Sequence, residues 1–258
     1  MATVQTDDQV QISYQVQGEG PTNLILVHGW MVSSAVYNKL AGQLQDVRMI
    51  RPDLRGTGSS DKPDGGYSIE RYAKDILAVA DDAGADKFVI VGHSMGGQVA
   101  QWVAATAPQR VQGMILINTV PASGIPLPDE AVGLFRNSAQ NRDSQAAILG
   151  MACKELSEDD QNALLDDAGQ IPAACIQGAF DAWTAGGFAD KLGQITAPTL
   201  VVATDDPFLP PDFLTGAVVN PIAKARLTYL PGPGHYPLVE RTPETASIVH
   251  SFLAGLSS

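Results

Sequence analysis

The sequence predicts an α/β fold in which a mostly parallel sheet is flanked by helices and carries a helical insertion. Continuous apolar runs at 24–27 and 199–203 are typical of strands that are buried on both faces. Such runs alternate with amphipathic helical segments, and this alternation produces right-handed crossovers and parallel strand pairing. Between residues 129 and about 193, in contrast, the patterns are helical and include no convincing strand. We therefore expect one parallel-sheet core with a helical lid.

The strands and helices of the core can be placed in chain order. A turn at residues 7 and 8 separates the first two strands, and the second alternates apolar and polar residues. Ser33 and Ser68 are N-cap residues for helices that run to about residue 44 and from 69 to 83, and Gly84 ends the second helix. The expected strands are 2–6, 9–17, 24–27, 47–50, 89–91, 111–117, 199–203 and 225–230.

The insertion begins with a proline-rich linker at 121–128. Gly186 and Gly187 form a hinge-like break near its end, before the strand pattern resumes. A helical segment of this size between parallel strands is expected to cover the carboxyl edge of the sheet as a lid. The helices expected within it are 130–137, 144–154, 158–168 and 172–185, and a last helix closes the core at Thr242–Leu256.

The composition limits which classes of binding partner and which cellular compartment we expect for this chain. The chain has 258 residues, of which 45% are hydrophobic and 17% charged, so it can bury a substantial core. A formal charge of −12 disfavours nucleic acid and anionic membranes as partners. The polar start does not resemble a signal peptide, and no apolar stretch is long enough to span a membrane. Cys153 and Cys175 form no metal-ligand spacing and are expected to be reduced thiols, which favours a cytoplasmic protein without a metal.

A serine stands at a sharp turn between the central strand and the helix that follows it. The run from residue 89 to residue 97 is Val-Ile-Val-Gly-His-Ser-Met-Gly-Gly. A bulky side chain two places from Ser94 would collide with the crossing strand and helix, and Gly92 and Gly96 remove that clash. The strained turn lifts the Ser94 hydroxyl above the sheet edge. This pattern predicts that Ser94 is a catalytic nucleophile.

A serine nucleophile requires a general base and a group that orients the base. His235 lies in a glycine-rich loop after the last expected strand, whereas His93 lies inside the turn and His28 is expected to support its own loop. We therefore predict His235 as the base. Asp205 and Asp206 both follow a strand end and both qualify as the orienting acid.

The attacked carbonyl becomes an oxyanion, which requires preorganised donors. The backbone N–H of Met95, at the start of the helix, is one predicted donor. The second comes from the loop after residue 27, where Gly29 allows a close backbone approach and the N–H of Trp30 becomes available. We expect no cofactor to be required.

These motifs together resemble the α/β-hydrolase superfamily, whose fold implies a mostly parallel eight-stranded sheet with a lid inserted after the sixth strand. Residues 1–120 and 194–258 then form the core and 121–193 the lid. The resemblance rests on the segments 28–30, 53–60, 92–97, 206–210 and 234–240. It favours Asp206 over Asp205, because the family's acid typically precedes an x-x-hydrophobic-Pro stretch such as the one that ends in Leu209-Pro210. Thr204 departs from the family pattern, which usually has a glycine near this place.

The resemblance is strongest to small bacterial carboxylesterases and to the cofactor-free haloperoxidase (perhydrolase) group. It implies a serine hydrolase that cleaves small esters or lactones through an acyl-enzyme. Alternatives are perhydrolysis on the same residues, hydrolysis of carbon–carbon bonds, and a slow receptor-like protein. Haloalkane dehalogenases and epoxide hydrolases have an aspartate where Ser94 stands and are disfavoured. Phe180, Trp183 and Phe188 in the lid are candidate pocket residues, and the sequence leaves the oligomeric state open.

Overall fold

An eight-stranded sheet runs through the molecule in the order β1-β2-β4-β3-β5-β6-β7-β8. The structure is a computed structural model that describes residues 1–256. The first two strands pair antiparallel, β2 also pairs antiparallel with β4, and all other neighbours pair parallel. The strands are β1 (Ala2–Gln5), β2 (Gln11–Gln17), β3 (Thr22–Val27), β4 (Val47–Pro52), β5 (Phe88–His93), β6 (Val111–Ile117), β7 (Thr199–Ala203) and β8 (Ala225–Tyr229).

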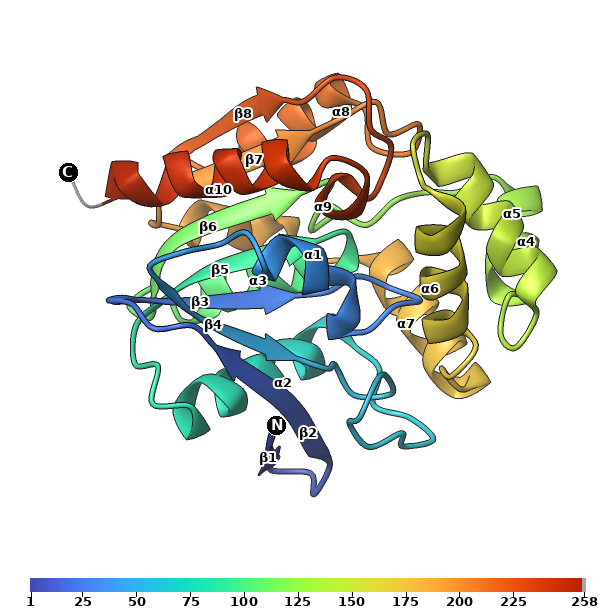
Figure 1. Ribbon diagram of the computed structural model, residues 1–258, viewed down its shortest axis with the longest axis horizontal. Coiled ribbons are helices and arrows are strands. Elements are labelled where there is room, and N and C mark those ends of the chain that lie inside the picture. Colours follow the sequence, from blue (N-terminus) through green and yellow to red (C-terminus); the bar gives the residue numbers. More distant parts are fainter. Residues whose placement is uncertain (257–258) are drawn as a thin grey trace.

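Helices cover both faces of the sheet, which buries its central strands (Figure 1). All residues of β5 are buried, as its unbroken apolar run predicts. On one face α2 (Ile69–Asp82) packs against α3 (Met95–Thr106), and on the other α1 (Asn38–Ala41) contacts α10 (Thr242–Leu256). The Ser68 hydroxyl caps α2 by accepting the N–H of Arg71 at 3.1 Å.

Four α-helices lie between β6 and β7, beyond the carboxyl ends of the parallel strands (Figure 1). They are followed by a 3₁₀ helix at Ala189–Gln194 that returns to the core. The indole N–H of Trp30, from the core, donates to the carbonyl of Ile176 at 2.9 Å and so joins the two parts. The four helices are α4 (Asp129–Arg136), α5 (Arg142–Ala152), α6 (Glu158–Ala168) and α7 (Ala173–Ala185).

Short helical elements account for most differences from the sequence expectation. The helix expected from about residue 34 to 44 is a 3₁₀ turn at Ser34–Tyr37 followed by α1, which stops before Gly42. Glycine is a poor helix former, so the chain leaves the helix there. Single-turn elements that the periodicity does not reveal are α8 (Pro211–Leu214), a π-helical turn at Thr215–Val219, and α9 (Pro237–Glu240).

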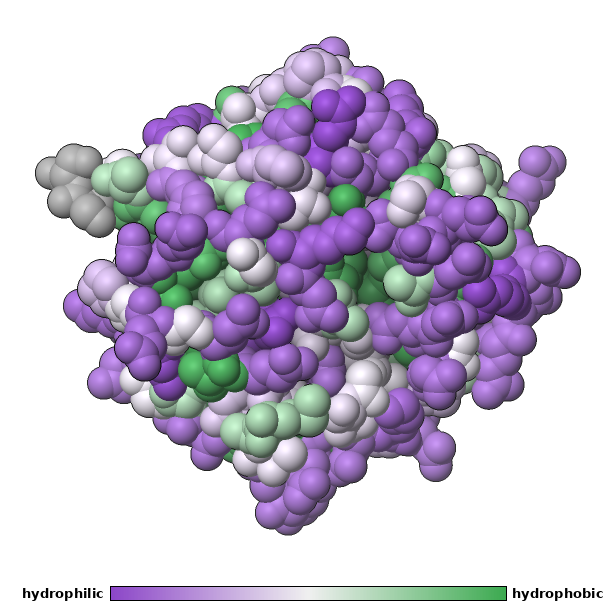
Figure 2. Space-filling model, viewed as in Figure 1, coloured by the Kyte–Doolittle hydropathy of each residue, from purple (hydrophilic) through white to green (hydrophobic). Residues whose placement is uncertain are grey.

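The surface is mainly hydrophilic on the face shown in Figure 2, and hydrophobic residues are visible there mostly in recesses between elements. This distribution accords with a formal charge of −12. Among residues 1–256, no helix combines the length and the apolar character that crossing a membrane requires.

Candidate active site

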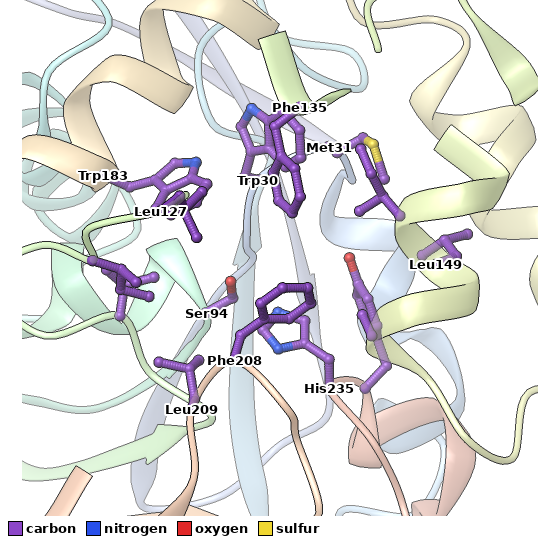
Figure 3. A pocket seen from close by; sticks show the side chains of 15 residues that line it. Trp30, Met31, Ser94, Leu127, Phe135, Leu149, Trp183, Phe208, Leu209 and His235 are labelled. Carbon is purple, nitrogen blue, oxygen red and sulfur yellow. The ribbon is translucent and has the colours of Figure 1, made fainter. Parts of the chain in front are cut away.

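Ser94 occupies a strained turn between β5 and α3. Its backbone has φ 55° and ψ −124°, a conformation that non-glycine residues rarely adopt. A Cβ on Gly92 would lie 2.4 Å from the carbonyl oxygen of Gly96, and a Cβ on Gly96 would lie 2.2 Å from that of Val27. Glycine is therefore required on both sides of the serine. The Ser94 hydroxyl is directed into a cavity (Figure 3).

His235 and Asp206, which are 29 residues apart in the chain, are in direct contact. The ring Nδ1–H of His235 donates to Asp206 Oδ2 at 2.5 Å, and the N–H of Phe208 donates to Asp206 Oδ1 at 2.9 Å. Asp206 is buried, so its carboxylate holds the ring with little competition from water. A proton on Nδ1 leaves Nε2 unprotonated and able to accept a proton.

The neighbouring Asp205 faces away from the histidine. Its carboxylate accepts hydrogen bonds from the Tyr229 hydroxyl and from the N–H of Gly232 and lies 3.7 Å from the ammonium of Lys154. The hydrogen bond from Tyr229 holds the pKa of Asp205 below its usual range. The structure thus brings Asp206, and not Asp205, to His235.

Ser94 and His235 line the same cavity, and in the view of Figure 3 His235 lies below the side chains of Trp30 and Phe135. Among residues 1–256, the Ser94 hydroxyl has no hydrogen-bond partner. The hydrogen bond between a catalytic nucleophile and its general base is often long in unliganded active sites and shortens when substrate binds.

The carbonyl of His235 is held from two sides. His93 Nε2 lies 2.8 Å from it, and the amide of Asn118 donates to it at 3.1 Å. Burial lowers the pKa of His93 well below its usual range, and the nearby His235 lowers it further, so His93 is a neutral hydrogen-bond donor. Thr204, which departs from the family pattern, is buried and donates its hydroxyl to the Gly234 carbonyl at 2.7 Å. The threonine therefore ties the end of β7 to the histidine loop.

The two predicted oxyanion donors are the backbone N–H groups of Trp30, in the loop after β3, and of Met95, at the start of α3. Within residues 1–256, neither the N–H of Trp30 nor that of Met95 meets an acceptor. The Met95 N–H is free because it is the first residue of α3. Gly29 places the other donor close, since a Cβ at this position would lie 2.9 Å from the Cβ of Ser94.

His28 orients the peptide that carries the Trp30 N–H. Its Nε2 accepts the N–H of Leu54 at 3.0 Å, so the proton is on Nδ1, which donates to the Gly29 carbonyl at 2.8 Å. The carbonyl and the N–H of a trans peptide point in opposite directions, so fixing the carbonyl also fixes the Trp30 N–H. Burial lowers the pKa of His28 and keeps its ring neutral. This places His28 in the loop-supporting position that its sequence context suggests.

The cavity beside Ser94 has a volume of about 60 Å³ and an apolar wall. Trp30 stacks on Phe135 with ring centroids 5.5 Å apart, and Trp183 meets both rings edge-on (Figure 3). Of the residues that the structure describes, no Asp, Glu, Lys or Arg lines this wall. The lining residues are Trp30, Met31, Ser94, Val120, Ile125, Leu127, Phe135, Ile148, Leu149, Ala152, Trp183, Phe208, Leu209, His235 and Tyr236.

The three candidate pocket aromatics have different positions. Trp183 lines the cavity. Phe180 departs from the sequence expectation because it does not line this cavity; its ring packs against Trp183, with centroids 5.1 Å apart, and it lines a separate groove. Phe188 is a correction to the sequence expectation, because it packs on Trp102 of α3 with centroids 4.8 Å apart and does not line the cavity.

Sequence reasoning missed several wall residues, among them the aromatic residues Phe135, Phe208 and Tyr236. Phe135 lies in an expected amphipathic helix, and Phe208 lies two residues after Asp206. For Phe208, its place two residues after the candidate acid Asp206 is the sequence signal that points to the cavity. No group of three His, Cys, Asp or Glu residues placed to hold a metal ion occurs in the described part of the chain.

Comparison with known proteins matches residues 24–248 to a sequence model described as the alpha/beta hydrolase family. The chain is also similar to a non-heme chloroperoxidase of Streptomyces lividans, with 28% identity over 81% of this chain and 84% of that protein.

Solved structures extend the comparison over the whole chain. An esterase of Exiguobacterium antarcticum has a TM-score of 0.91 and 22% identity, with 100% of this chain and 99% of the other covered. An N-acyl homoserine lactone degrading enzyme has a TM-score of 0.82 and 29% identity, with 97% of this chain and 100% of the other covered.

Proposed function

The chain belongs to the alpha/beta hydrolase family, and from this premise we propose that it is a serine hydrolase of small carboxylic esters or lactones. The observation that carries the proposal is the convergence of three groups. The Ser94 hydroxyl and the His235 ring face one cavity, and His235 is held by the buried carboxylate of Asp206. Similarity to a lactone-degrading enzyme supports the same substrate chemistry.

The proposed reaction proceeds in two halves. Ser94 Oγ attacks the substrate carbonyl, while His235 Nε2 takes its proton and Asp206 stabilises the resulting imidazolium. The N–H groups of Trp30 and Met95 bind the oxyanion. His235 then protonates the leaving oxygen, and an acyl group remains on Ser94; the alcohol departs from an ester, whereas in a lactone it stays attached as a hydroxyl of the acyl group. Water attacks this ester with His235 again as the base, and the acid product is released.

The cavity indicates a short and uncharged acyl group. The cavity has a volume of only about 60 Å³, which favours a small acyl group. The apolar wall offers no counter-ion for a charged acyl group, and burial of an unpaired charge is costly. We therefore propose acetyl to butyryl groups, or lactone rings of similar size, as the preferred acyl part.

A panel of p-nitrophenyl esters with acyl chains of two to twelve carbons, together with unsubstituted lactones, tests this proposal. We expect kcat/KM to be highest for acyl chains of two to four carbons and to fall for longer chains. The Ser94→Ala variant should retain the fold, as judged by circular dichroism, and lose nearly all turnover. Retention of most activity in this variant would contradict the proposed nucleophile.

Perhydrolysis is the second candidate, favoured by the similarity to a non-heme chloroperoxidase. In this reaction hydrogen peroxide replaces water in the second half, so that the acyl-enzyme yields a peracid and free Ser94. The assay compares bromination of monochlorodimedone, with acetate, peroxide and bromide, against hydrolysis of p-nitrophenyl acetate. A bromination rate that exceeds hydrolysis and disappears in Ser94→Ala would favour the second candidate.

A further inference from the structure

Glu240, at the end of α9, uses one carboxylate to hold two separate segments of the chain. Its Oε2 accepts the N–H groups of Gly234, Lys154 and Glu155, each at 2.9 Å. Its Oε1 accepts the N–H of Tyr236 at 2.9 Å. Two of these donors flank His235, and the other two lie two and three residues after the end of α5. Four N–H groups on one carboxylate are unusual, because a backbone N–H is normally satisfied by a carbonyl.

The same two segments also touch each other directly. The N–H of His235 donates to the carbonyl of Ala152, the last residue of α5, at 2.9 Å. A Cβ on Gly234 would lie 2.3 Å from that carbonyl oxygen. The backbone that carries His235 is therefore pressed against the end of α5, and Glu240 supplies the hydrogen bonds on both sides of this contact.

We propose that Glu240 is a positioning residue that sets the place of the His235 ring by joining the histidine loop to the end of α5. This inference rests on the proposed function, in which His235 is the base. In this arrangement His235 reaches its working position only while the α4–α7 segment is seated on the core. A small displacement of a catalytic group is sufficient to slow a reaction strongly.

Two ion pairs also lie between these parts of the chain, and we expect each to hold the segments less strongly than Glu240 does. Arg241 pairs with Glu155, and Lys154 lies near Asp205, but all four side chains are partly exposed to solvent. Exposed ion pairs contribute little stability because water competes for both charges. We expect them to keep the segments near each other after Glu240 is removed, without fixing the backbone of His235.

The test measures amide hydrogen exchange and ester hydrolysis in Glu240→Ala and Glu240→Gln. Glu244→Gln is the matched control, since Glu244 lies four residues further on and, within residues 1–256, its carboxylate has a polar contact only with Arg241, at 3.5 Å. In Glu240→Ala we expect exchange to accelerate at least about tenfold in both peptides, 152–156 and 232–237. The kcat for p-nitrophenyl acetate should fall about 10- to 100-fold with little change in KM. Glu240→Gln keeps one acceptor oxygen and should lie between the wild type and Glu240→Ala.

Acceleration in neither peptide or in only one of them, or a kcat in Glu240→Ala within twofold of the wild type, would overturn the inference. A Glu240→Gln variant with a kcat as low as that of Glu240→Ala would overturn it as well. If Glu240→Ala fails to fold, Glu240→Gln against Glu244→Gln gives the same comparison. Failure of the proposed function has a different signature, because the wild type would then lack Ser94-dependent turnover while the exchange measurement still reports the link.

Discussion

Replacement of Asp206 by Asn tests how the histidine ring is held, and the adjacent Asp205 provides a control of the same chemistry. Asp206 accepts two hydrogen bonds, one from Phe208 N–H at 2.9 Å and one from His235 Nδ1–H at 2.5 Å. An Asn side chain has one acceptor oxygen. If this oxygen stays with Phe208, the amide NH₂ faces His235 and requires an unprotonated Nδ1. The proton then moves to Nε2, which can no longer accept the proton of Ser94.

The expected fall in kcat follows from this change in the tautomer of His235. Loss of the correct tautomer in Ser-His-Asp enzymes lowers kcat by about 10⁴-fold. We expect a fall of about 10³- to 10⁴-fold in Asp206→Asn, which corresponds to about 4–5.5 kcal/mol of activation free energy. Asp205→Asn should change kcat by less than about threefold, because its partners are Tyr229 and Gly232, away from the ring.

The assay is steady-state hydrolysis of p-nitrophenyl acetate at pH 8, with active enzyme counted by titration and folding checked by circular dichroism. More than a tenth of wild-type kcat in Asp206→Asn would refute the proposed role of this carboxylate. An equal loss in both variants would refute the assignment of different roles to the two aspartates.

Two further predictions concern the ion pairs of Arg55, a buried residue in the loop that follows β4. Arg55→Ala should lower the free energy of unfolding by about 3–5 kcal/mol in urea titrations, because it removes the 2.6 Å partner of the buried Asp75 carboxylate and leaves this group only the 3.1 Å contact with Arg71 among the described residues. A loss below about 1 kcal/mol would contradict this. The hydrogen bond from Arg55 holds the pKa of Asp8 well below its usual 3.8, so this ion pair stabilises the fold above about pH 4 and is lost as the pH falls below it. The stability difference between wild type and Asp8→Asn should therefore be present at pH 7 and shrink toward pH 2, and a difference that is constant with pH would argue against the pair.

The turn around Ser94 was predictable because its requirements are local. Gly92 and Gly96 are needed by the close crossing of strand and helix, and this steric demand is visible in the order of residues alone. The helix Glu158–Ala168 was also predicted with its observed bounds. Its N-cap Ser157 and its acidic first turn are local signals, and they do not depend on tertiary packing.

The cavity wall was less predictable because it depends on how the insertion packs. Phe135 and Phe188 both lie in helical or near-helical parts of the insertion, yet only Phe135 reaches the cavity, while Phe188 packs on Trp102. Periodicity shows that such residues are buried but does not show against which surface. The sequence therefore could not separate the two.

Neither the choice between the two aspartates nor the contacts of Glu240 could be predicted from the pattern of residues. Adjacent residues in an extended or turn segment point in different directions, and the residues alone left Asp205 and Asp206 equal. Glu240 lies at the end of a four-residue helix and binds N–H groups about 85 residues away, at Lys154 and Glu155. No periodic pattern reports a contact of that range.

Mass spectrometry of the acid-quenched enzyme tests the central claim most directly, since the account requires an acyl group on one particular oxygen. After a brief exposure to excess p-nitrophenyl acetate, we predict a gain of one acetyl group per chain, located at Ser94 by peptide fragmentation and absent in Ser94→Ala. Turnover that persists in Ser94→Ala, or an acetyl group that forms at another residue during turnover, would contradict the account.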